Sequence, residues 1–124
     1  MKLIDLKKLV KSFHYAFRGV IRLLANEQNA RIHAMITIIV GMLAYVLDVT
    51  RIEAAVLFMA VILVFAMEII NTAIEKICNE VDLKHNENIA VIKDGMAGAV
   101  LIASVIATVV ALLIFLPHVR VFFE

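Results

Sequence analysis

The chain has 124 residues, of which 64% are hydrophobic, and its mean hydropathy is +1.00. This composition is too apolar for an ordinary soluble domain and indicates a membrane protein, and the net charge of +1 gives no indication of a nucleic-acid partner. Cys78 is the only cysteine, which excludes an intrachain disulfide and any metal or redox site built on two cysteines. We interpret residues 1–124 as a single all-α membrane domain.

An amphipathic helix is predicted at the amino terminus, at about residues 3–25. Its apolar side chains recur at helical spacing along one face, at Leu6, Leu9, Val10, Phe13, Phe17, Val20, Ile21 and Leu24. The opposite face is mostly basic, with Lys7, Lys8, Lys11, Ser12, Arg18 and Arg22. Such a helix is suited to lying in the membrane interface beside anionic lipid. It is either a plain anchor or an anchor that also shares in ligand binding, and the sequence leaves both open.

Three apolar runs follow, each about as long as a bilayer crossing requires. We predict three spans, at about residues 32–49, 54–78 and 95–116. A polar cluster at 26–31 precedes the first span, and a short polar turn at 48–53 separates the first two. The second helix is expected to continue to about Asp82, where a polar stretch to Asn88 forms a loop or a loose helix end. Pro117 is expected to stop the third span.

The distribution of positive residues predicts how the chain crosses the membrane. The amino-terminal segment carries most of them, namely Lys2, Lys7, Lys8, Lys11, Arg18, Arg22 and Arg31. The first connection has only Arg51 and the tail only Arg120, whereas the second connection has Lys76, Lys84 and Lys93. We therefore expect the amino terminus and the second connection in the cytoplasm, and the carboxyl terminus outside.

The second span ends in a stripe of oxygen-bearing side chains. Positions within about 60° of one line on a helix hold Glu68, Asn71, Thr72, Glu75, Asn79 and Asp82. Carboxylates at bilayer depth are costly and need partners, so they are functional candidates. The predicted topology also places Glu27, Lys93 and Asp94 at the same cytoplasmic rim.

These residue types suit phosphoryl transfer. Two carboxylates and an amide oxygen are the ligands that Mg²⁺ prefers, and Lys93 could act as a point charge on a phosphate. Glu68 could accept a proton from a lipid hydroxyl. Together they supply a metal, neutralisation of phosphate charge and a base at the nucleophile.

The same residues also permit simpler interpretations. Glu75 and Lys93 could form an interhelical ion pair that only fixes packing, and Lys93 and Asp94 could be plain rim charges. Glu68 alone could bind a proton or cation in a small transporter, or the whole chain could be a helical interaction partner. The sequence has no GxxxxGK[ST] phosphate loop. Residue chemistry by itself therefore predicts an acidic site at the cytoplasmic rim and does not single out a kinase.

The run from Glu68 to Glu75, Glu-Ile-Ile-Asn-Thr-Ala-Ile-Glu, resembles the prokaryotic diacylglycerol kinase family, which includes the undecaprenol kinases. Other segments resemble the family as well: Tyr15-Ala-Phe-Arg18-Gly19, Asn26-Glu27, Arg31-Ile32-His33, Lys93-Asp94 and Phe115-Leu116-Pro117. The resemblance covers nearly the whole chain. It implies a homotrimer in a bacterial inner or plasma membrane, with a surface helix and three spans in each subunit. It further implies transfer of the γ-phosphoryl group of MgATP to a lipid alcohol at the cytoplasmic interface.

The resemblance also implies roles for single residues. Glu68 resembles the catalytic base, and Glu27 and Glu75 resemble the carboxylates that bind Mg²⁺. The expected ATP contacts are Lys8, Tyr15, Glu27, Asn71, Glu75, Lys84, His85, Asn86, Lys93 and Asp94. The expected lipid contacts are Glu68, Arg31 and Ala97.

The chain departs from the family pattern at several positions. Asn79 stands where an aspartate is common, which weakens a further carboxylate role there. The segment Lys84-His85-Asn86 replaces a Glu-Tyr-His type of sequence, so its contacts with ATP must differ. Ala97 stands where the diacylglycerol-specific branch can have serine, which favours undecaprenol over diacylglycerol as the substrate. The expected product is undecaprenyl phosphate, or else phosphatidic acid; the alternative function is a proton- or cation-coupled transporter that uses Glu68.

Overall fold

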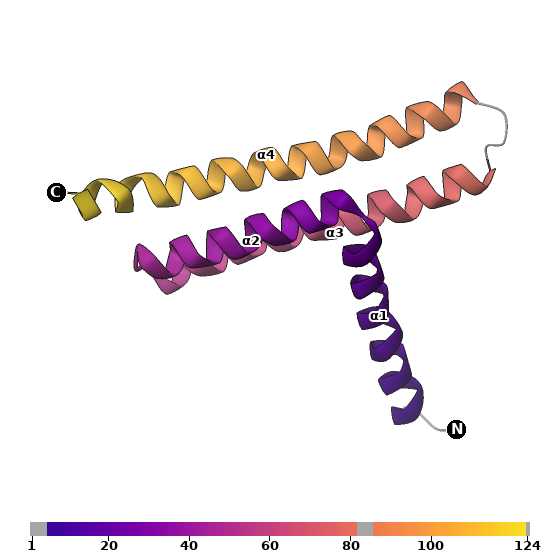
Figure 1. The fold of residues 1–124 in the computed structure, drawn as a ribbon, viewed down its shortest axis with the longest axis horizontal. Coiled ribbons are helices and arrows are strands. Elements are labelled where there is room, and N and C mark those ends of the chain that lie inside the picture. Colours follow the sequence, from indigo (N-terminus) through magenta and orange to yellow (C-terminus); the bar gives the residue numbers. More distant parts are fainter. Residues whose placement is uncertain (1–4, 82–85, 124) are drawn as a thin grey trace.

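The computed structural model describes residues 5–81 and 86–123, and these residues form four helices. The helices are α1 (Leu6–Asn26), α2 (Gln28–Val46), α3 (Arg51–Val81) and α4 (Glu87–Phe123). Figure 1 shows α2, α3 and α4 running alongside one another, while α1 diverges from them at the start of α2, and the last turns of α3 and the first turns of α4 extend beyond that point. By length and composition, α2, α3 and α4 are each able to cross a membrane. The prediction of an all-α membrane protein with three spans is therefore confirmed.

The joint between α1 and α2 is a single residue, Glu27. Its backbone is extended, with φ −104° and ψ 123°, and its N–H donates to the carbonyl of Leu23 at 2.8 Å. The helix α2 then begins at Gln28, so the polar cluster at 26–31 is helical except at Glu27. The physical reason is that one extended residue is enough to turn the chain, and no proline or glycine in this segment disfavours helix. Glu27 therefore has a fixed place where two helices meet.

Most of the buried residues in the described chain lie on α3, namely Leu57, Val64, Glu68, Thr72 and Cys78. The helix α4 returns along α3 and makes the most extensive packing contact, whereas α2 covers α3 less fully (Figure 1). Small residues at every fourth position of α4 permit this close approach, and Ala103 among them is buried. The central position of α3 is what carries polar side chains into the interior.

The helix α4 is longer than predicted at both ends. It begins at Glu87, because the side chain of Asn86 accepts a hydrogen bond from the N–H of Asn88 at 2.9 Å and caps the first turn. It also continues through Pro117, so the prediction that this proline stops the helix is wrong. A proline removes only one helical hydrogen bond, and helices in membranes tolerate this loss when neighbouring groups compensate.

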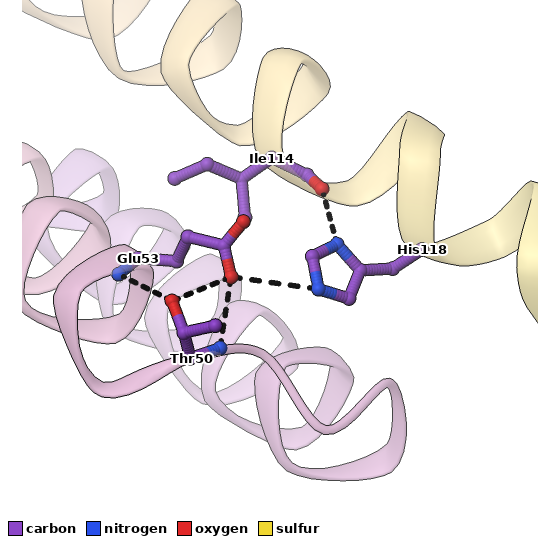
Figure 2. Close-up of polar contacts among 4 residues, drawn as sticks. All are labelled: Thr50, Glu53, Ile114 and His118. Atoms are coloured by element: carbon purple, nitrogen blue, oxygen red, sulfur yellow. Dashed lines mark hydrogen bonds and ion pairs between the residues drawn. The ribbon is translucent and has the colours of Figure 1, made fainter.

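Figure 2 shows a polar cluster that joins the start of α3 to the last turns of α4. Thr50 donates to Glu53 Oε2 from its backbone N–H and its hydroxyl, each at 2.8 Å, and the N–H of Glu53 donates to Thr50 Oγ1 at 3.3 Å. This reciprocal pair is a capping box. The His118 ring has Nδ1 2.8 Å from the Ile114 carbonyl and Nε2 3.4 Å from the same Glu53 oxygen. The cluster thus fixes the segment after Pro117 against α3.

Glu53→Ala is expected to lower the free energy of unfolding, because it removes a helix cap and the contact with His118. The measurement is reversible unfolding in detergent micelles. His118→Ala should lower the free energy of unfolding by less than Glu53→Ala does. In the Glu53→Ala background it should cause no further loss, as a double-mutant cycle would show. Glu87→Ala, at an exposed carboxylate in the first turn of α4, is the matched control. Additive losses from Glu53 and His118 would contradict the contact.

Candidate active site

Glu68 is a buried carboxylate in the middle of α3. Its side chain is 2% exposed, and the neighbouring Thr72 on the same face is 7% exposed. Within the described residues, Glu68 Oε2 is buried and has no hydrogen-bond partner. The preceding residues, 54–67, are apolar and pack α3 into the bundle, so the Glu68 carboxylate is buried as well. An unpaired buried carboxylate oxygen costs free energy, which favours a functional rather than a structural role.

Three ionisable side chains from other positions lie near Glu68. His33 on α2, Glu27 at the joint between α1 and α2, and Glu75 two turns along α3 all interact with it electrostatically. Like-charged groups gathered in one region repel one another unless a cation or proton is shared among them. Glu27 and Glu75 therefore each lie near enough to Glu68 to interact with it electrostatically.

Two lysines face the two outer carboxylates. Lys76 Nζ lies 3.1 Å from Glu27 Oε1, and Lys93 Nζ lies 4.0 Å from Glu75 Oε1. Lys93 also donates to Asn79 Oδ1 at 2.9 Å. The side chains of both lysines are more than one third exposed, so these ion pairs contribute little to stability and exchange readily for other partners. The predicted Glu75–Lys93 pair is present only at the limit of contact.

The other predicted site residues are spread over the chain. Asn71 is half-buried on α3, and Asp94, Arg31 and Ala97 are exposed. Asn86 lies at the start of α4, where it caps the helix. Lys84 and His85 lie outside the described residues.

Two predicted nucleotide contacts, Lys8 and Tyr15, lie on α1. Tyr15 is 55% exposed, with Lys11 Nζ 5.9 Å from its ring centroid. Lys8 is exposed in the first turn of α1, where its N–H donates to Asp5 Oδ1 at 3.2 Å. Because α1 leaves the bundle, the described chain by itself does not gather Lys8 and Tyr15 with the acids (Figure 1).

A cleft of about 280 Å³ between α2, α3 and α4 leads away from this region. Its wall includes His33, and Val64 one turn before Glu68, and extends to Phe115. The hydroxyls of Thr37 and Thr108 donate to carbonyls of their own helices, at 2.7 and 2.8 Å, so the wall is almost entirely apolar. Sequence reasoning missed this cleft, although the small residues Ala107 and Ala111 on α4, which help to form it, are a readable signal.

The family model of prokaryotic diacylglycerol kinase matches residues 14–115 of the chain. The chain belongs to the prokaryotic diacylglycerol kinase family. As a member of that family it is a membrane-embedded lipid kinase, a transferase that acts on a lipid and a nucleotide.

Individual relatives agree with the family assignment. The chain is similar to the undecaprenol kinase of Bacillus subtilis (strain 168), with 34% identity over 113 residues, which cover 91% of this chain and 92% of the relative. It is also similar to a diacylglycerol kinase of Synechocystis, with 36% identity over 110 residues, covering 88% of this chain and 63% of the relative. The diacylglycerol kinase of Escherichia coli (strain K12) is 28% identical over 111 residues, covering 90% and 91%.

Kinases of this family are expected to use a divalent metal with the nucleotide, and the donor set of this family member fits that use. Among the described residues there is no group of three or more histidine, cysteine or acidic side chains that could hold a metal ion. Mg²⁺, however, is usually held by one or two carboxylates together with phosphates and water. Glu27 and Glu75 provide two carboxylates whose lysine partners exchange readily. The carboxylates of Glu27 and Glu75 therefore fit a metal ion that binds together with the nucleotide.

Proposed function

We propose that the chain transfers the γ-phosphoryl group of ATP to the hydroxyl of a long-chain lipid alcohol, with Mg²⁺ as the metal. The observation that carries this proposal is Glu68, a buried carboxylate with an unpaired oxygen, beside an apolar cleft in a lipid kinase. The cleft offers apolar surface to a lipid chain, and Glu68 offers a base to the hydroxyl at its end. Undecaprenol is the first proposed substrate and diacylglycerol the second, on the strength of Ala97 and of the Arg31-Ile32-His33 segment.

In this proposal Glu68 takes the proton from the lipid hydroxyl. The resulting oxygen attacks the γ-phosphorus of ATP, the bond from that phosphorus to the bridging oxygen breaks, and ADP leaves. The burial of Glu68 keeps bulk water from competing for the phosphoryl group. A base placed in this way contributes about 10²- to 10⁴-fold to the rate.

The outer residues of the site are proposed to serve the nucleotide. Glu27 and Glu75 would hold Mg²⁺, which when bound neutralises charge on the phosphates. Lys93 would lie against a phosphate oxygen as a point charge. The proposed further contacts of the nucleotide are Lys8, Tyr15, Asn71, Lys84, His85, Asn86 and Asp94. Arg31 and Ala97 are proposed to contact the lipid at its polar end.

We further propose that α1 lies on the membrane surface and that three chains form a homotrimer in a bacterial inner or plasma membrane. The apolar side chains of α1 support its placement on the membrane surface. Leu6, Phe13 and Phe17 are each about 70% exposed in the single chain, and the membrane interface would bury them. The distribution of basic residues supports a cytoplasmic amino terminus and an external carboxyl terminus. A trimer would shield the half-buried Asn71 and the exposed Glu75 from lipid.

Transfer of labelled phosphate from ATP to lipid in detergent micelles tests the proposal. We expect label in undecaprenol with a kcat/KM severalfold above that for diacylglycerol, because an apolar cleft separates long-chain lipids only modestly. If the chain prefers diacylglycerol, the order of the two proposed substrates is reversed, but the proposed kinase activity stands. If neither lipid becomes labelled, and liposomes take up protons in a way that depends on Glu68, the transporter alternative replaces the proposal.

A further inference from the structure

Lys93 of α4 lies between two oxygen acceptors on α3. Its Nζ is 2.9 Å from Asn79 Oδ1 and 4.0 Å from Glu75 Oε1. Asn79 and Glu75 are four residues apart on α3, so they share one face of the helix. The closer acceptor is therefore the neutral amide, and the carboxylate is held at the limit of contact.

The choice of acceptor matters for the charge that Lys93 presents. An amide oxygen takes one of the three ammonium donors in a charge-assisted hydrogen bond and leaves the positive charge uncompensated. A direct contact with Glu75 would neutralise the ammonium and would also occupy a carboxylate oxygen. By binding Nζ, Asn79 leaves both Lys93 and Glu75 available to other ligands.

We propose that Asn79 is a positioning residue of the kinase, which holds Lys93 ready for the phosphates of the nucleotide and away from Glu75. This inference depends on the proposed function, in which Lys93 serves ATP and Glu75 serves the metal. Without an acceptor at position 79, the ammonium closes on Glu75, and the nucleotide with its metal must break that ion pair in order to bind. Asn79 is exposed, so its side chain is not needed to fill the core.

The test compares Asn79→Ala, which removes the acceptor, with Asn79→Asp, which keeps an oxygen in its place. We expect Asn79→Ala to raise the KM for ATP about three- to tenfold, which matches the net contribution of an ordinary hydrogen bond, while kcat changes little. Asn79→Asp should also raise the KM, because a carboxylate at this position compensates the positive charge that the amide leaves available. Equilibrium binding of a fluorescent ATP analogue without lipid should weaken by the same factor. Glu80→Ala, at the next and also exposed position of α3, is the control and should leave the KM unchanged.

A second comparison separates positioning from a general effect on the surface. In a Lys93→Met background, Asn79→Ala should cause no further rise in the KM for ATP, because its partner is gone. If Asn79→Ala leaves the KM and the analogue affinity unchanged in an active kinase, or if its effect adds to that of Lys93→Met, the inference is wrong and the proposed function stands. If the native chain labels no lipid, both fail together.

Discussion

Glu68→Gln is expected to lower kcat for lipid phosphorylation by about 10²- to 10⁴-fold, while the KM for ATP stays within about twofold. The amide is close in size to the carboxylate but cannot take the hydroxyl proton. Because Glu68 is buried among helices and the proposed nucleotide residues lie at other positions of the chain, binding of ATP should be nearly unaffected. Steady-state kinetics with labelled ATP, together with binding of an ATP analogue, measure the two effects separately.

The control for this variant is Glu80→Gln, which makes the same chemical change at an exposed position of α3. It should retain native kinetics. Unfolding in detergent shows whether Glu68→Gln is folded, and a loss of activity is meaningful only with a native-like midpoint. A folded Glu68→Gln variant with full activity would remove Glu68 from the mechanism, and the cleft would then have to deliver the lipid to another base.

Glu75→Gln is expected to raise the Mg²⁺ concentration needed for half-maximal activity by at least about tenfold, because one of two proposed metal carboxylates loses its charge. Activity is titrated with Mg²⁺ at a fixed concentration of ATP. Binding of Mn²⁺ in the presence of the ATP analogue, followed by electron paramagnetic resonance, gives a readout that does not depend on turnover. The variant should have a weaker Mn²⁺ affinity in the same proportion.

The competing interpretation is that Glu75 only pairs with Lys93 to fix two helices. It predicts that Glu75→Gln and Lys93→Met have the same consequence, and that the double variant is no worse than either. The metal interpretation predicts different consequences, since Lys93→Met should raise the KM for ATP and leave the metal requirement nearly unchanged. An unchanged Mg²⁺ titration for Glu75→Gln would support the ion pair.

The fold could be predicted where the information is local. The three spans follow from the length of the apolar runs, and they are confirmed. The ends of the helices were harder to predict from the sequence, because each end depends on single residues. Glu27 alone separates α1 from α2, and Pro117 lies inside α4. The Thr50–Glu53 capping box, by contrast, has a readable sequence spacing and could have been predicted.

Contacts between helices could not be predicted in the same way. The Lys76–Glu27, Lys93–Asn79 and His118–Glu53 contacts depend on how far α4 and the α1–α2 joint are shifted and rotated against α3. Buried packing sets that offset, and no spacing within one helix encodes it. The stripe on α3 therefore indicated candidate residues for the site, whereas the Lys76–Glu27 and Lys93–Asn79 contacts required three-dimensional information.

The continuity of α3 has a consequence for the lipid environment of the enzyme. Glu53 and Glu68 are fifteen residues apart on one unbroken helix, a distance of about 23 Å at ~1.5 Å per residue, in a bilayer whose hydrocarbon layer is about 30 Å thick. A helix of this kind does not stretch, so a thicker or thinner membrane is accommodated by tilting the bundle or deforming the bilayer. In the proposed function, the depth of Glu68 in the bilayer would therefore change with the tilt of the bundle.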